Sequence, residues 1–339
     1  APFLLGMSSL CSGQTLVETI EQTLLTNPNI QSSAYNVDAA DALRRQAVAG
    51  YLPSIDLVLA RGLEKSDNTT TRASGDTNRN FDRFERAITL NQMLYDGFST
   101  AAFVKQQDAI LAATTQRLAT TRENTALRSA QAYLEVLRRD QVVALSQANL
   151  VQHDETLLKI EERFESGVGT KVDVVQTKGR RAQSKSSVLL SEKDAQNGRV
   201  EFYRVVGESP RELSLPVRPK GLPETLEQAV QLAFRNNPQV KAAQFDIEAS
   251  QSARKQLLGG YHPRVDLALG ATRNDDMDGS PGANDDETAV IKMSYNLYRG
   301  GADRAKMKEA IARINGAEQA LIALRRSITH DVSILWNDL

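Results

Sequence analysis

Residues 15–59 read TLVETIEQTLLTNPNIQSSAYNVDAADALRRQAVAGYLPSIDLVL, residues 225–269 read TLEQAVQLAFRNNPQVKAAQFDIEASQSARKQLLGGYHPRVDLAL, and the two stretches align without a gap. They place the same dipeptides at matching positions: Asn27-Pro28 with Asn237-Pro238, Gly50-Tyr51 with Gly260-Tyr261, and Asp56-Leu57 with Asp266-Leu267. After loops of unequal length, Leu94-Tyr95-Asp96-Gly97 matches Leu297-Tyr298-Arg299-Gly300. Self-similarity of this length predicts one structural unit that has been duplicated.

Each copy is predicted to begin with two helices and to continue with two strands. The first helix ends at Asn-Pro, where proline begins the next helix because its missing N–H is not needed in a first turn. After Pro53 and Pro263 the period changes to two, so that apolar and polar side chains alternate. We predict helices at 15–26, 28–51, 225–236 and 238–260, strands at 54–63, 85–95, 264–273 and 288–298, and polar loops at 64–80 and 274–286.

Long helices follow each strand pair. Residues 98–166 contain neither Gly nor Pro, and an unbroken helix of that length would extend about 100 Å at about 1.5 Å per residue. Apolar residues recur in sevens only in patches, which is typical of coiled-coil pairing on more than one side. The turn Gly167-Val168-Gly169-Thr170 leads into a returning helix at 170–206, and a third long helix is predicted at 302–339.

The predicted organisation has four parts. Residues 1–13 are interpreted as the remnant of a signal peptide, 14–210 as the first repeat, 211–223 as a linker, and 224–339 as the second repeat. Because duplicated units have similar lengths, the second repeat is expected to continue beyond Leu339, and the chain is interpreted as a fragment. Cys11 is an alternative, lipid-acylated start of the mature chain.

Composition excludes several classes of function. With 41 basic and 42 acidic residues the formal charge is -1, so no overall field favours nucleic acid. Cys11 is the only cysteine, which rules out an intrachain disulfide and a cysteine-based zinc cluster.

No apolar run approaches the roughly 20 residues of a membrane helix. Strands that cross a bilayer must close into a barrel, which takes about eight strands, so a chain with four must share the barrel with copies of itself.

The order of these features resembles the TolC family of outer-membrane channels. The resemblance is carried by the duplicated helix, Asn-Pro, helix, Tyr-x-Pro-x-x-x-Leu strand order, by Leu94-Tyr95-Asp96-Gly97, and by Arg163-Phe164-Glu165-Ser166-Gly167 followed by Asp173-Val174. It implies a mainly α protein with membrane β, in which a homotrimer closes a twelve-stranded barrel in outer-membrane lipid above a long α-helical barrel in the periplasm. It also implies a periplasmic adaptor and an inner-membrane transporter as partners, and no enzyme activity.

Two site predictions come from this resemblance. Gly167, Val168, Gly169 and Thr170 match the helical tip that contacts the adaptor, although they also suit a plain helical-hairpin turn. Asp173 resembles a member of the family's closure network, although a solvated aspartate at a helix start is an equal alternative. The corresponding second tip would lie beyond Leu339.

The branch of the family is predicted from two stretches. SGVGTKVDVVQ at 166–176 and RVVGESP at 204–210 most resemble the branch that serves type I protein secretion, including exporters of large adhesins. Drug or metal efflux is one alternative. A soluble coiled-coil scaffold is another, because it would also explain long helices without chemistry.

No catalytic, cofactor-binding or metal site is predicted. Asn274, Asp276, Asp278, Gly279 and Asp285 approximate the spacing of a calcium loop, but the flanking segments are predicted strands, and a solvated loop is preferred. The three histidines, His153, His262 and His330, are too scattered to ligate one metal ion. Phosphate-binding loops, nucleophile motifs and dinucleotide fingerprints are absent from the sequence.

Overall fold

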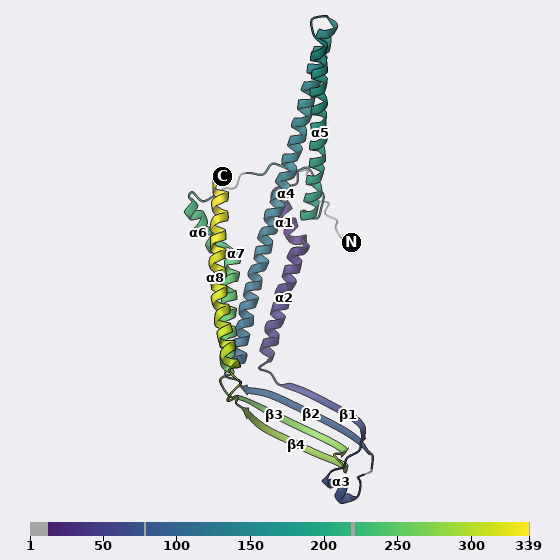
Figure 1. Cartoon of the computed structure of the whole chain (residues 1–339), viewed down its shortest axis with the longest axis vertical. Coiled ribbons are helices and arrows are strands. Elements are labelled where there is room, and N and C mark those ends of the chain that lie inside the picture. The colour runs from purple at the N-terminus through teal and green to yellow at the C-terminus, as the bar shows by residue number, and fades with distance from the viewer. Residues whose placement is uncertain (1–12, 78, 218–220, 339) are drawn as a thin grey trace, which may run out of the picture. The chain divides into compact units, whose positions relative to one another are not determined.

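The computed structural model describes residues 13–77, 79–217 and 221–338, and Figure 1 shows their order along the chain. Of the predicted signal-peptide remnant only Gly13 lies within the described residues, and Cys11 lies outside them. The elements are α1 (Leu16–Thr26), α2 (Pro28–Ala49), β1 (Ser54–Glu64), α3 (Thr69–Ser74), β2 (Phe81–Tyr95), α4 (Ser99–Glu165), α5 (Lys171–Val206), α6 (Leu226–Asn236), α7 (Pro238–Gly259), β3 (Arg264–Met277), β4 (Ser280–Ser294) and α8 (Ala302–Asn337).

The chain forms two compact units that do not coincide with the two repeats. Unit 1 comprises the described residues of Ala1–Tyr35 and Arg117–Thr225, and unit 2 comprises those of Asn36–Gln116 and Leu226–Leu339. The repeats at 14–210 and 224–339 describe how the sequence is organised. The compact units cut across them because β2 of the first repeat pairs with β3 of the second.

The helices that precede each strand pair begin at residues whose side chains cap them. Thr15 begins α1 with a capping box, in which its hydroxyl accepts from the Glu18 N–H and the Glu18 carboxylate accepts from the Thr15 N–H. The side chain of Asn237 accepts from the Gln239 N–H and Pro238 occupies the first turn of α7. The first Asn-Pro also packs inward, because the Asn27 amide donates to the Val205 carbonyl oxygen at 3.1 Å.

The core of unit 1 lies between α4 and α5. Its buried members are Ala132, Tyr133, Val136, Phe202, Val205 and Val206. The Tyr133 hydroxyl lies 2.7 Å from the Gln14 carbonyl oxygen and 2.6 Å from that of Ser214. It thereby ties the start of the chain to the segment after α5, where Gln14 and Leu213 form a short parallel bridge.

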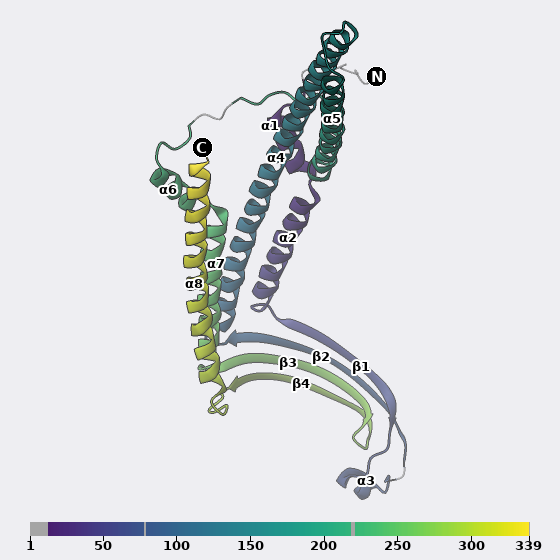
Figure 2. The ribbon, with the colours of Figure 1, turned by 45° about the horizontal axis from the view of Figure 1, so that its top comes forward.

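Unit 2 contains one antiparallel sheet with the strand order β1-β2-β3-β4. Figure 2 shows the four strands side by side. The register places Ile55, Leu90, Leu269 and Ala289 in one row across the sheet. Because paired residues point to the same face, Ile55, Leu57 and Leu59 share a face with the apolar residues of the other strands, and Ser54, Asp56 and Ala60 lie on the opposite face.

The strands extend farther into the polar segments than predicted. The polar stretch 274–286 is not a loop. Most of it belongs to β3 and β4, because its polar residues pair across the hairpin, as in Asn274 with Asn284 and Arg273 with Asp285. Asp278 and Gly279 make the turn with positive φ angles of 54° and 75°. At the other end, β4 stops at Ser294 instead of 298, since Ser294 pairs with the first residue of β3, Arg264.

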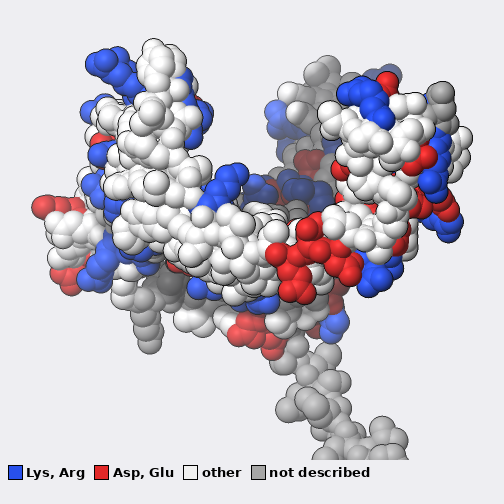
Figure 3. Space-filling model, turned by 90° about the horizontal axis from the view of Figure 1, so that it is seen from below, with Lys and Arg blue, Asp and Glu red and all other residues white. Residues whose placement is uncertain are grey.

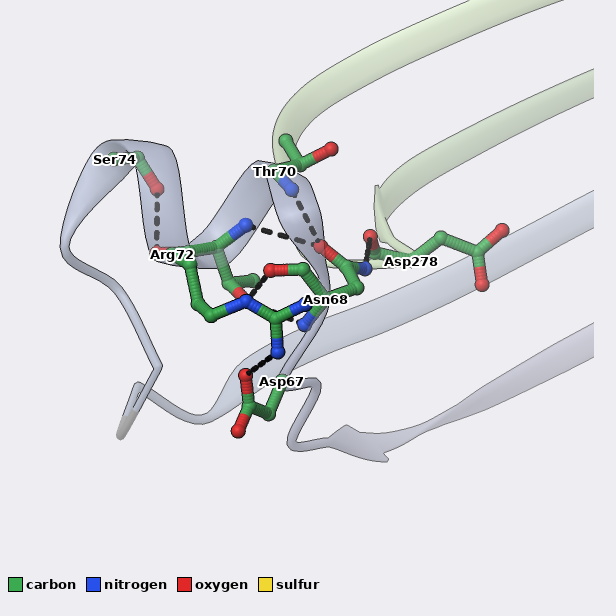
Figure 4. A network of polar contacts seen from close by, with 7 residues as sticks. Asp67, Asn68, Thr70, Arg72, Ser74 and Asp278 are labelled. Atoms are coloured by element: carbon green, nitrogen blue, oxygen red, sulfur yellow. Dashed lines mark hydrogen bonds and ion pairs between the residues drawn. The ribbon is translucent and has the colours of Figure 1, made fainter.

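The loop between β1 and β2 contains an unpredicted short helix, α3. Asn68 begins it, because its side-chain oxygen accepts from the N–H groups of Thr70 and Thr71. The Asn68 amide then donates to the Asp278 carbonyl oxygen at 2.7 Å, a contact drawn in Figure 4. A Cβ placed on Gly279 would lie 2.3 Å from the Thr71 side chain. The loop of the first hairpin therefore packs tightly on the turn of the second.

Candidate functional site

The first candidate site is the apolar face of the sheet in unit 2. Along β1 and β4 its side chains are exposed, with Leu57 at 68% and Ile291 at 70% of their accessible surface. A continuous face of exposed apolar side chains on a sheet marks a surface that is covered in the functional state. The opposite face carries Asp56, Thr89, Asp266 and Thr288.

Among the described residues, the two outer strands leave their outward edges unpaired. β1 pairs only with β2 and β4 only with β3 among the described strands. Long strands with open edges pair readily with another chain. Among the described helices, none combines the length and the apolar character that crossing a bilayer requires.

The segment that follows β2 packs closely against the segment that follows α7, both in unit 2. Gly97 has a positive φ of 67°, and a Cβ there would lie 2.6 Å from the His262 Cβ and 2.7 Å from the Gly259 carbonyl oxygen. Tyr95 meets the rings of Phe98 and His262 edge-on, with centroid separations of 5.8 and 6.5 Å. His262, considered above only as a metal ligand, packs against this junction. The Gly and Tyr positions that match between the two repeats are the sequence signal that could have indicated this junction.

The second candidate site is the turn between α4 and α5 in unit 1. The N–H groups of Val168 and Gly169 both donate to the Arg163 carbonyl oxygen, at 3.0 and 2.9 Å, and Gly167 has a positive φ of 76°. This closes α4 in the manner of a glycine-terminated helix. Val168 is 72% exposed at the turn. The structure thus presents an apolar side chain on a helical tip that backbone hydrogen bonds close.

Thr170 and Asp173 fix the start of α5. The Thr170 hydroxyl accepts from the Asp173 N–H at 3.2 Å, and the Thr170 N–H donates to the Asp173 carboxylate at 3.3 Å. The hydrogen bond from the Thr170 hydroxyl lowers the pKa of Asp173, with a further contribution from the Thr170 N–H and a smaller one from the charge of Arg163. Asp173 therefore has a local structural role as a capping residue, and its place in a closure network stays a prediction.

Replacing Asp173 by asparagine is expected to loosen the first turn of α5. Since the folded state lowers this pKa, the stabilisation is present above the ordinary value of 3.8 and is lost as the pH falls through the folded value. The difference in amide protection between wild type and D173N at Val174 should be several-fold near neutral pH and should shrink as the pH falls below the ordinary pKa of 3.8. Nuclear magnetic resonance hydrogen exchange measures it. E155Q, an exposed substitution in α4, is the control, and equal protection in D173N and wild type at neutral pH would contradict the capping role.

The calcium-like spacing does not form a metal site in the described part of the chain. No group of three or more His, Cys, Asp or Glu side chains there is placed to hold a metal ion. The Asp276 carboxylate accepts from the Gly282 N–H at 2.7 Å, and the Asp278 carbonyl oxygen accepts from Asn68. These residues shape the hairpin turn.

Comparison with known proteins identifies the family. A family model described as "Outer membrane efflux protein" matches residues 19–208 and 229–338. The chain belongs to this family. The predicted resemblance to TolC-type channels is confirmed, and the outer membrane efflux protein family comprises channel proteins of the outer membrane.

Relatives of the outer membrane efflux protein family match nearly the whole chain. The outer membrane efflux protein BepC of Brucella suis is 25% identical over 99% of this chain and 72% of the relative. TolC of Escherichia coli is 23% identical over 99% of this chain and 70% of the relative. The alkaline protease secretion protein AprF of Pseudomonas aeruginosa is 22% identical over 99% of this chain and 72% of the relative.

Solved structures confirm the fold. The outer membrane protein VceC of Vibrio cholerae superposes with a TM-score of 0.80 at 19% identity, covering 95% of this chain and 78% of that one. CusC superposes with a TM-score of 0.78 at 12% identity, covering 94% and 73%. The predicted fold class, mainly helical with four membrane strands per chain, is confirmed. The chain is an outer-membrane exit channel component of a tripartite system, and the soluble scaffold considered above is wrong.

Proposed function

We propose that three copies of this chain form a passive exit duct for type I protein secretion. The observation that carries the duct is the sheet of unit 2, which has one exposed apolar face, one polar face and two unpaired edges. Three such sheets joined edge to edge give a closed barrel of about twelve strands, the apolar face toward lipid and the polar face toward the passage. Energy for transport would come from an inner-membrane ABC transporter.

The helical tip of unit 1 is proposed to contact the periplasmic adaptor. Support comes from Val168, which is exposed on the hydrogen-bonded turn, and from Val172, four residues on, which is also exposed. Exposed turns on rigid arms commonly carry binding function. Asp173 lies next to this surface. It is proposed to belong to the network that holds the channel closed, in addition to capping the start of α5.

Secretion is preferred to efflux because of the sequence around the tip and because of relatives named for secretion. AprF and the proteases secretion protein PrtF of Dickeya chrysanthemi match this chain at 22% and 23% identity. Drug or metal efflux is the second candidate, and its support is the similarity to BepC.

Deleting the gene in its native host separates the two candidates. For secretion, we expect one or more large proteins to disappear from the culture medium or the cell surface, with unchanged sensitivity to small toxic compounds. Comparative proteomics of the medium and growth inhibition by dyes, detergents and metal salts measure the two effects. Restored secretion upon complementation is the control. Raised sensitivity with an unchanged set of exported proteins would overturn secretion in favour of efflux.

A further inference from the structure

The apolar face of the sheet ends, toward the hairpin turns, in a line of charged residues. Following each strand along this face from the helices toward the turns, the first charged residue is Arg61 on β1, Arg86 on β2, Arg273 on β3 and Glu287 on β4. On the side of the helices the same face carries only uncharged residues in the strands, such as Leu57, Ile88 and Ile291. We call these four charged residues the boundary residues.

The boundary residues cross the sheet obliquely. Arg86 pairs with Arg273, whereas Glu287 pairs with Ala271, two residues before Arg273, and Arg86 pairs with Leu59, two residues before Arg61. The line therefore advances about 14 Å along the strands over about 14 Å of sheet width, a slope of about 45°. Strands of membrane barrels tilt by about 35–45° from the membrane normal. A tilt of that size in the direction of this slope would place the four boundary residues at one depth in the membrane.

Each boundary arginine is paired with an aspartate, which lies nearer the hairpin turns for Arg61 and Arg86 and directly opposite in the register for Arg273. Arg61 bonds Asp82 at 2.7 Å, Arg273 lies 3.5 Å from Asp285, and Arg86 pairs with Asp275. The arginine side chains stay accessible, with exposures of 71% for Arg61, 58% for Arg273 and 37% for Arg86. The guanidinium groups of Arg61 and Arg86 thus lie between the apolar face and their carboxylate partners. Figure 3, a view from the sheet end, shows basic and acidic groups beside an extended uncharged surface.

Two hollows meet on the same face beside this line. The first, of about 330 Å³, has Arg86 and Arg273, the apolar residues Leu57, Ile88 and Ala271, and the acidic residues Asp285, Asp286 and Glu287 in its lining. The second, of about 540 Å³, lies against Ile88 and Ala271 again and continues along apolar and small residues of all four strands (Ile55, Leu90, Leu269, Gly270 and Ala289). Together they form a groove that is apolar for most of its length and has both guanidinium and carboxylate groups at one end, Glu287 lining both hollows.

We propose that the boundary arginines bind the phosphate groups of membrane lipids, with one acyl chain of each lipid in the adjoining hollows. Guanidinium groups bind phosphate oxygens through paired, charge-assisted hydrogen bonds, and phosphate is the anionic group found at the edge of the hydrocarbon layer. Glu287 offers an acceptor to a headgroup hydroxyl or ammonium group. The inference rests on the proposed function, which directs this face to lipid and places the hairpin turns on the extracellular side.

The test compares lipids with equal acyl chains on the detergent-extracted full-length protein. Native mass spectrometry with dioleoyl phosphatidic acid or dioleoylglycerol measures binding to wild type, to R86Q/R273Q and to R83Q/R264Q. The control pair lies on the polar face, and its arginines are likewise bound to carboxylates, Arg83 to Glu85 and Arg264 to Asp266, each at 2.9 Å. We expect R86Q/R273Q to weaken phosphatidic acid binding by about tenfold, with dioleoylglycerol binding unchanged and the control equal to wild type.

Several outcomes would overturn the proposal. Wild-type affinity of R86Q/R273Q for phosphatidic acid would do so, and so would an equal loss for both lipids or displacement of phosphatidic acid by the same concentration of inorganic phosphate. R86K/R273K keeps both charges and should retain most of the affinity, which guards against a folding defect in the glutamine variant. The oligomer mass in the same spectra tests the duct separately, because a wild-type monomer would contradict the proposed function whatever lipids it binds.

Discussion

Export through the assembled system is expected to fall at least about tenfold when Val168 is replaced by aspartate. Val168 is 72% exposed at the α4–α5 turn, and Val172 beside it in sequence is 73% exposed. If this surface is covered by the adaptor, the new carboxylate must give up its water within an apolar contact, which costs far more than the methyl groups contributed. The turn itself should persist, because its hydrogen bonds run through the backbone of Arg163, Val168 and Gly169.

Secretion assays on cells carrying V168D, together with crosslinking of the channel to its adaptor, measure this effect. V168T has nearly the same shape without a charge and should keep most of the export. The oligomer in membrane extracts should be present at wild-type amounts in both variants. Normal export by V168D would show that the turn is only a structural connection.

A second large effect is expected in the core of unit 1. Phe202 has 0% of its surface exposed and belongs to the cluster that contains Tyr133, Val136 and Val206. F202A should lower the free energy of unfolding of unit 1 by about 3–5 kcal/mol, because it removes a buried ring and leaves a cavity. Hydrogen exchange read by mass spectrometry, on peptides from α4 and α5, measures the loss within this unit.

Tyr203 provides a matched comparison one position along the same helix. It is 57% exposed, so Y203A should change the stability by less than about 0.5 kcal/mol. Equal effects of F202A and Y203A would mean that the packing around Phe202 is not the centre of the core.

Much of the fold could be predicted because the repeat shows the same elements twice. Asn-Pro marks a helix boundary through the chemistry of proline, and the alternation after Pro53 and Pro263 marks two strands. The strand ends near the hairpin turns could not be predicted in this way. Their polar residues look like loop residues, and only pairing across the hairpin, as between Arg273 and Asp285, makes them part of the sheet. The short helix α3 has only the local cap by Asn68 as a sequence signal, and the contact of Asn68 with Asp278 joins residues that are far apart in sequence.

The candidate sites were predictable to different degrees. The glycines of the α4–α5 turn signal their own conformation, which the positive φ of Gly167 bears out, whereas contact with an adaptor stays a prediction. Asp173 was ambiguous in the sequence, and the structure adds its bond with Thr170. The line of Arg61, Arg86 and Arg273 was not predictable, because three residues on three strands become neighbours only once the register is known.

The pairing of β2 with β3 across the repeat boundary has a consequence for the history of the molecule. A single-repeat ancestor would have had a first strand and a second strand but no β3 within the same chain. Its second strand would have taken the first strand of another copy as its neighbour, so the wall of the pore would have required twice as many polypeptides. Fusion of two such copies would turn that contact between molecules into one within a molecule. Afterwards the halves were free to diverge, as their unequal hairpin loops have done.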